Sequence, residues 1–220
     1  MAAQMPTGGQ LPLDLPVRTA LGAEDFVVSD SNRDAVAWLD RWPDWPGPAL
    51  AIYGPPGCGK SHLAHVWQSR SRARFLDAAT PDGPPDSTNL ILDATAFPEE
   101  RLFHLYNHVK AAGGSLLILS REAPARWPVS LPDLASRLAS IPAIAVAPPD
   151  DTLLAAVLAK HFADRQLMVT ADVVDHLVRH IERSFAAAAD IAAALDSAAL
   201  AQQRRPTLAL AREVLKLFGH

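Results

Sequence analysis

Apolar residues in the first two thirds of the chain form five short runs, and segments with helical spacing lie around them. Continuous apolar runs are typical of strands in a parallel sheet, which helices cover on both faces. Strands that alternate with helices predict an α/β fold with a doubly wound, five-stranded parallel sheet. The predicted strands are 49–53, 74–77, 89–93, 115–120 and 141–146, and the predicted helices are 30–41, 61–70, 98–112 and 131–140.

The pattern changes after Pro148 and Pro149, where the strand-like runs end. The remaining segments have helical character, with no strand between them, and they are 150–167, 171–183, 184–203 and 207–218. We therefore expect a core domain over 17–149 and a small all-helical lid subdomain over 150–220. Residues 1–16 contain several Gly and Pro and no helical period, which predicts a flexible N-terminal arm.

Polar residues indicate where two of the helices begin. Asp30 or Ser31 is expected to cap helix 30–41, because a short side chain with an oxygen acceptor satisfies the free N–H groups at that end. Glu99 and Glu100 are expected to cap helix 98–112, where acidic groups interact favourably with the helix dipole.

The composition narrows the function classes. The 220 residues are 49% hydrophobic and 20% charged, which is enough apolar surface for a folded core. The formal net charge of −4 argues against strong direct DNA binding, since nucleic-acid binders carry a basic excess. One cysteine, no apolar run of membrane-spanning length and no secretory signal favour a cytoplasmic protein without disulfides or membrane contact.

The strongest chemical signal follows strand 49–53 directly and matches G-x-x-x-x-G-K-[S/T] at every fixed position. A glycine-rich turn between a strand and a helix lets backbone N–H groups face a phosphate, and the helix N-terminus adds a favourable dipole. We expect this phosphate loop to bind ADP or ATP, with Lys60 at the β- and γ-phosphates and Ser61 as a Mg²⁺ ligand. Its residues are Gly54, Pro55, Pro56, Gly57, Cys58, Gly59, Lys60 and Ser61, followed by His62.

A magnesium–nucleotide site needs an acid at the end of another strand, and Asp93 is the best candidate. Asp93 either binds Mg²⁺, directly or through water, or simply caps the end of its strand. Many ATPases of this type carry a second acid at the next position to orient the attacking water, but this chain has Ala94. The sequence therefore predicts a site that holds a nucleotide and whose own hydrolysis is weak or absent.

Two further polar residues are candidates for contact with a γ-phosphate. Ser120 ends strand 115–120 and is either a weak phosphate sensor or an ordinary strand-end serine. Arg137 lies on the amphipathic helix 131–140. From its spacing alone, Arg137 is either a finger that reaches the nucleotide of a neighbouring protein or a solvated helix arginine.

Several motifs taken together resemble one family. They are Gln10-Leu-Pro-Leu-Asp-Leu15, Phe26-Val-Val-Ser-Asp-Ser-Asn32-Arg33, the phosphate loop, Leu105-Tyr-Asn107 and Leu131-Pro-Asp-Leu-Ala-Ser-Arg137-Leu138. Over essentially the whole chain, the sequence resembles the Hda family, the DnaA-related AAA+ regulators of bacterial replication initiation. The string 131–138 and the N-terminal motif are the most specific parts, because a phosphate loop alone is shared by many functions.

The resemblance implies an AAA+ core with a helical lid that binds ADP and attaches to the DNA-loaded sliding clamp. Attachment would use Gln10, Leu11, Leu13 and Leu15, as an extended peptide that places alternate apolar side chains in a groove. The clamp-bound protein would then stimulate ATP hydrolysis by DnaA, with Arg137 as a finger acting in trans.

The resemblance also implies roles near the base and in the lid. Asn32 is expected on the adenine side of the nucleotide. Some relatives carry a lid arginine that touches the nucleotide; here that position is Ala186, and Arg183 is the nearest cation. A chain that ends after the lid is expected to have no DnaA-type DNA-binding domain, in agreement with the acidic charge balance.

Two other interpretations stay open. The chain could be an AAA+ ATPase or helicase-loader relative that uses its own turnover, which Ala94 disfavours. It could also be an adaptor on a P-loop scaffold that bridges the clamp and a partner without needing a nucleotide. Because AAA+ domains usually meet with one subunit's finger at the next one's nucleotide, a homodimer or a mixed assembly with DnaA is expected under the resemblance.

Overall fold

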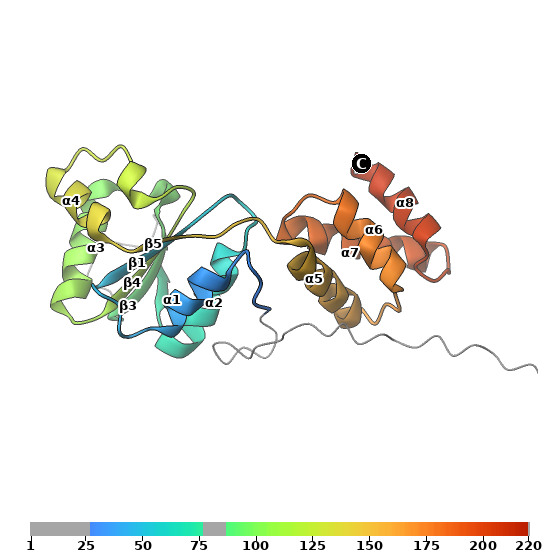
Figure 1. Ribbon diagram of the computed structural model, residues 1–220, viewed down its shortest axis with the longest axis horizontal. Helices are drawn as coiled ribbons and strands as arrows, with labels where there is room; N and C mark the ends of the chain where they lie inside the picture. The colour runs from blue at the N-terminus through green and yellow to red at the C-terminus, as the bar shows by residue number, and fades with distance from the viewer. Residues whose placement is uncertain (1–26, 77–86, 220) are drawn as a thin grey trace, which may run out of the picture.

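The computed structural model describes residues 27–76 and 87–219 of the chain. These residues form two units, a core built around a sheet and a lid built only of helices (Figure 1). Within the described ranges, no helix is both long and apolar enough to cross a membrane.

The core contains the predicted five-stranded parallel sheet. Its strands lie in the order β2-β3-β4-β1-β5, and every neighbouring pair is parallel. Their bounds are β1 (Ala49–Tyr53), β2 (Arg74–Leu76), β3 (Asn89–Asp93), β4 (Ser115–Ser120) and β5 (Ala143–Ala145). The predicted run 141–146 is thus shortened to an edge strand whose alanines are exposed, whereas β4 is buried along its whole length.

Helices cover both faces of the sheet, as a doubly wound fold requires. Side chains alternate along β1, so that Leu50 and Ile52 pack with α1 and α2, while Ala49 and Ala51 pack with α3 and α4. The core helices are α1 (Arg33–Asp40), α2 (Lys60–Ser71), α3 (Glu99–Ala111) and α4 (Pro132–Ser140), and the short 3₁₀ turns are η1 (Ala94–Ala96) and η2 (Pro124–Arg126).

The lid has a hydrophobic core of its own. On α6 the buried residues Val173, Val174, Leu177 and Val178 recur at helical spacing, and the helix packs against α5 and α8. The cluster that they join contains only residues from the lid helices and their connections. Those helices are α5 (Asp151–Asp164), α6 (Ala171–His180), α7 (Phe185–Ala201) and α8 (Leu208–Leu217).

The predicted caps of two helices are corrected by the structure. Neither Asp30 nor Ser31 caps α1: both lie in the preceding turn, and Asn32 occupies the cap position. Glu99 and Glu100 do lie in the first turn of α3, where the helix dipole favours acids, but neither makes a capping hydrogen bond. The Glu99 carboxylate instead accepts hydrogen bonds from the backbone N–H groups of Ser130 and Leu131 at 2.9 and 3.3 Å. Glu99 therefore fixes the segment that leads into α4.

Candidate functional site

The phosphate loop connects β1 to α2, as its motif predicts. At Gly54, a Cβ atom would lie 2.2 Å from the Val146 carbonyl oxygen, so no larger residue fits. Gly59 has a φ of +99° at the position before α2, a conformation that glycine adopts without steric cost. Glycines therefore allow both the close approach to the strand-end segment and the turn into the helix.

Lys60 begins α2 and folds back over the loop. Its Nζ donates hydrogen bonds to the carbonyl oxygens of Gly54 and Pro55, both at 2.8 Å, and lies 3.7 Å from the Cys58 sulfur. Cys58 is 3% exposed and belongs to the core cluster, so it is the small filler that the sequence predicts. Ser61 is exposed on the first turn of α2.

The other two strand-end candidates lie at the same edge of the sheet as the loop. Ser120 is opposite Tyr53, and its backbone carbonyl accepts the Gly54 N–H at 3.2 Å. Asp93 is opposite Leu119. The Ser120 hydroxyl donates to the Glu122 carbonyl at 2.7 Å, so its proton is engaged within the strand end.

Asp93 is exposed, and one of its carboxylate oxygens caps the turn η1 by accepting the Thr95 N–H at 2.9 Å. This is the strand-end cap that was one of its two predicted roles. Its second oxygen has no hydrogen bond among the described residues. This edge of the sheet thus carries the exposed Ser61 hydroxyl, an Asp93 carboxylate oxygen and the glycine-rich loop. Such a donor set fits Mg²⁺ and a phosphate chain.

Asn32 lies in a buried turn near the loop. Its side-chain oxygen accepts the Ser29 N–H at 2.9 Å, and its amide nitrogen donates to the Val27 carbonyl at 3.0 Å. The neighbouring Ser31 carbonyl accepts the Ala147 N–H at 3.1 Å. Asn32 therefore shapes the segment that packs beside residues 146–147, where the loop also makes its closest contact.

The lid reaches the loop through the first residues of α7, Ser184 and Phe185, which we call the lid tip. The Phe185 N–H donates to the Gly57 carbonyl at 3.2 Å. Cβ atoms built on Gly57 and Gly59 would lie 2.6 Å from Ser184 Cβ and 2.7 Å from Phe185 Cε2. The two glycines are thus also needed for packing, because a larger side chain at either position would clash with the lid tip.

Arg183 and Ala186 flank the lid tip. The Arg183 guanidinium pairs with the Asp151 carboxylate at 2.6 Å and donates to the Pro149 carbonyl at 3.4 Å. It therefore ties the lid tip to the start of α5. Ala186 is exposed.

Arg137 is seated on α3. Its guanidinium donates to the side-chain oxygen of Asn107 and lies 4.7 Å from the Phe103 ring centre and 5.2 Å from the Tyr106 ring centre. Cations above aromatic faces are attracted by the ring quadrupole. Arg137 is half-buried, so it is neither a freely solvated arginine nor part of the phosphate loop.

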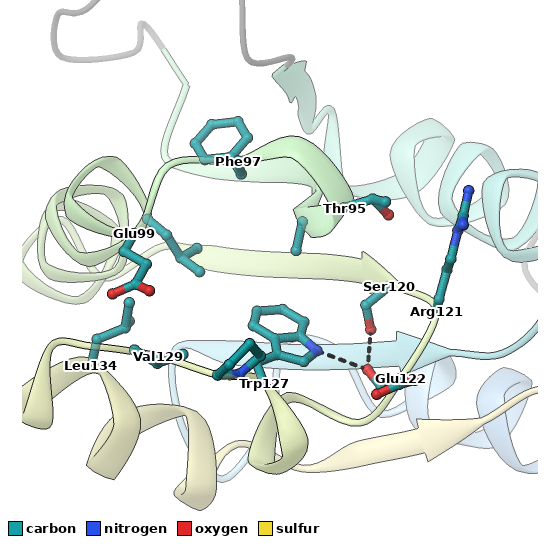
Figure 2. Close-up of a pocket in the computed structure, with 12 residues that line it drawn as sticks. Thr95, Phe97, Glu99, Ser120, Arg121, Glu122, Trp127, Val129 and Leu134 are labelled. Atoms are coloured by element: carbon teal, nitrogen blue, oxygen red, sulfur yellow. Dashed lines mark hydrogen bonds between the residues drawn. The ribbon is translucent and has the colours of Figure 1, made fainter.

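A cavity of about 360 Å³ lies between the strand ends and α4. In Figure 2 the Ser120 hydroxyl and the Trp127 ring nitrogen both point to Glu122, whereas Arg121 points away from them. The Trp127 N–H donates to the Glu122 carbonyl at 3.1 Å. The Ser120 hydroxyl and the Trp127 ring nitrogen are thus both engaged by the same carbonyl.

Sequence reasoning missed the lid tip and the support of Arg137. Ser184 was expected to start a helix, but nothing in the sequence linked it to a loop more than a hundred residues earlier. Asn107 is part of the motif Leu105-Tyr-Asn107, to which the sequence alone assigned no function. The predicted clamp residues Gln10, Leu11, Leu13 and Leu15 lie outside the described residues.

Comparisons with known proteins agree with this geometry. Residues 150–215 match the family model described as Hda, lid domain. The chromosomal replication initiator protein DnaA of Thermomicrobium roseum is 30% identical over 88% of this chain, which spans 49% of that protein.

Two solved structures share the fold. Domain III of the replication initiation protein DnaA from Thermotoga maritima has a TM-score of 0.73 at 18% identity, over 89% of this chain and 95% of that one. A replication initiator DnaA bound to AMPPCP and single-stranded DNA has a TM-score of 0.65 at 15% identity, over 86% of this chain and 69% of that one.

Proposed function

Since this chain is an Hda- and DnaA-related AAA+ protein, we propose that it is a nucleotide-binding regulator of DNA replication initiation. In this proposal it binds the sliding clamp through Gln10, Leu11, Leu13 and Leu15 and stimulates ATP hydrolysis by DnaA through Arg137. A cytoplasmic location and the absence of strong direct DNA binding belong to the same proposal, as does a homodimer or a mixed assembly with DnaA.

The nucleotide would be ADP or ATP. The N–H groups of the loop and of the first turn of α2 would hold its phosphates, with Lys60 as the cation, and Ser61 and Asp93 would hold Mg²⁺. When bound, the ion would neutralise phosphate charge. We propose that the chain's own hydrolysis is weak, because Ala94 offers no carboxylate to orient water.

One observation carries the regulatory part of the proposal: the Arg137 side chain is held by Phe103, Tyr106 and Asn107 of α3, which we call the seat of Arg137. A finger that serves another protein's nucleotide must be held on a surface apart from its own phosphate loop. The contacts of the Arg137 guanidinium are with three side chains of α3, and the residue is only half-buried. Such a seat limits the rotamers of a long side chain before the partner arrives, and ordering in advance favours binding and catalysis.

The test is a reconstituted hydrolysis assay. DnaA loaded with labelled ATP is incubated with the DNA-loaded clamp, ADP and this protein, and released phosphate is measured. The compared proteins are the wild type, Arg137→Ala, the double variant Gln10→Ala with Leu11→Ala, and the control Arg126→Ala, which removes an exposed arginine of η2. A trans-acting finger is worth roughly 10³–10⁵ in rate, so Arg137→Ala is expected to abolish the stimulation.

The outcomes separate the candidate functions. Loss of stimulation in Arg137→Ala and in the double variant, with the control unchanged, supports a finger and a tether. Full stimulation by Arg137→Ala contradicts the finger. Clamp binding without any stimulation by the wild type favours the adaptor, and steady-state turnover by the chain alone, lost in Lys60→Ala, favours the ATPase.

A further inference from the structure

The lid tip lies directly against the phosphate loop, the segment that a bound phosphate chain would contact. A phosphate is held by N–H groups of the loop and by the N-terminus of the following helix. Here the Phe185 ring stands against Gly59, the residue that precedes α2, and Ser184 stands against Gly57. A backbone hydrogen bond from Phe185 to the Gly57 carbonyl fastens the tip in this place.

The charged group of the loop is also engaged by the chain itself. Both hydrogen bonds of the Lys60 ammonium to carbonyl oxygens, those of Gly54 and Pro55, are 2.8 Å long. A phosphate that used Lys60 would have to replace these bonds. The Lys60 ammonium is therefore engaged by two carbonyls of its own loop, and the lid tip donates to a third, that of Gly57.

Phe185 is not needed to hold the lid together. Its side chain is half-buried and lies outside the cluster of buried lid residues. The start of α7 is stabilised independently, because the Ser184 hydroxyl oxygen accepts the Ala187 N–H at 3.1 Å. The large apolar ring at this position is thus used against the phosphate loop rather than within the lid.

We propose that Phe185 is a self-blocking contact, such that its ring and a nucleoside di- or triphosphate compete for the phosphate loop. Nucleotide binding then releases the lid tip and changes the orientation of the lid. This inference rests on the nucleotide-binding part of the proposed function. Because the ring is uncharged, the competition does not distinguish a diphosphate from a triphosphate.

The test measures nucleotide binding by the full chain. ADP is titrated calorimetrically into wild type, Phe185→Ala and the control Phe218→Ala, which removes a partly exposed ring at the end of α8. Removing the block raises the population of the open loop, and the apparent dissociation constant falls in proportion. We expect Phe185→Ala to bind ADP and ATP each about tenfold more tightly, equal to about 1.4 kcal/mol, and the control to match wild type.

A second readout needs no variant. The Phe185 amide is hydrogen-bonded to the loop, so its hydrogen exchange is expected to be slow without nucleotide and faster when ADP is added.

Phe185→Leu, which keeps an apolar side chain on the folded lid, is expected to bind ADP with an affinity between wild type and Phe185→Ala.

Each result has a definite meaning. If wild type binds ADP and Phe185→Ala binds it equally or more weakly, the competition is wrong and nucleotide binding stands. If the Phe185 amide becomes more protected with ADP, the tip closes on the nucleotide and the inference is also wrong. If neither wild type nor Phe185→Ala binds ADP or ATP, the proposed nucleotide function fails and the competition fails with it.

Discussion

The phosphate loop and the seat of Arg137 are built in opposite ways. The loop is a continuous stretch in which eight successive residues supply the turn, the cation and the hydroxyl. The seat joins Arg137 of α4 to Phe103, Tyr106 and Asn107 of α3, about thirty residues earlier in the chain. A function carried by a local loop can be found from a motif, whereas one carried by packed helices needs the fold.

Lys60→Ala tests the local half of this comparison and has the largest expected effect. Hydrogen bonds to charged groups are worth up to about 3 kcal/mol, so ADP affinity is expected to fall about 100-fold while the fold is kept. Calorimetric titration measures the loss, and Lys216→Ala on α8 removes an exposed lysine elsewhere as the control. Unchanged affinity in Lys60→Ala would show that the loop does not hold the nucleotide.

Asn107→Ala tests the other half. The variant removes the oxygen that accepts the Arg137 hydrogen bond, which leaves the guanidinium less well oriented. We expect the stimulation of DnaA hydrolysis to fall about tenfold, with ADP and clamp binding unchanged. Asn107→Asp keeps the acceptor and is expected to retain activity, and His104→Ala removes an exposed side chain from the same helix. Equal losses in His104→Ala would mean that α3 as a whole, not this bond, supports the arginine.

The pH dependence near the phosphate loop gives the smallest expected effect. Burial first, and then the positive charges of His65 and Lys160, hold the pKa of His62 below its usual 6.5. The unfolded chain therefore binds this proton more readily than the folded protein. The free energy of unfolding rises with pH between the lowered pKa and 6.5, and this contribution is lost as the pH falls through that window.

Thermal unfolding of His62→Gln checks this expectation. Between about pH 7.5 and about pH 5.5 the midpoint of the wild type is expected to fall more than that of the variant, by about 1 °C because His62 is partly exposed. His104→Gln on α3 serves as the control. Identical pH profiles for wild type and His62→Gln would remove His62 as the source.

The sequence predicted the elements around the loop well, because their signals are local. β1, β3 and β4 have the predicted bounds, since apolar runs and glycine turns mark strand ends directly. The cap of α1 was wrong because three consecutive polar residues, Asp30, Ser31 and Asn32, all suit the position. The fate of Glu99 could not be seen, because its partners lie thirty residues ahead along the chain and are backbone groups.

The lid tip is the clearest limit of local reasoning. Its contact with Gly57 and Gly59 joins positions that no periodicity connects, and only the packing of lid against core brings them together. The resemblance made Arg183 the nearest cation to the lid position that touches the nucleotide in some relatives, and the structure gives its guanidinium Asp151 and Pro149 as partners. Whether a lid cation also reaches a bound nucleotide stays a prediction.

The separate hydrophobic core of the lid has a consequence for how such proteins diversify. Since the buried cluster excludes Phe185, this side chain can be exchanged without repacking the lid helices, whereas Ser184 also caps α7. Under the proposed competition, a substitution of Phe185 changes how the two units respond to a ligand at little cost to folding, whereas a large-to-small substitution inside the cluster opens a cavity. The tip is therefore the position where natural variation, or a designer, can alter the response of the protein while its architecture is inherited intact.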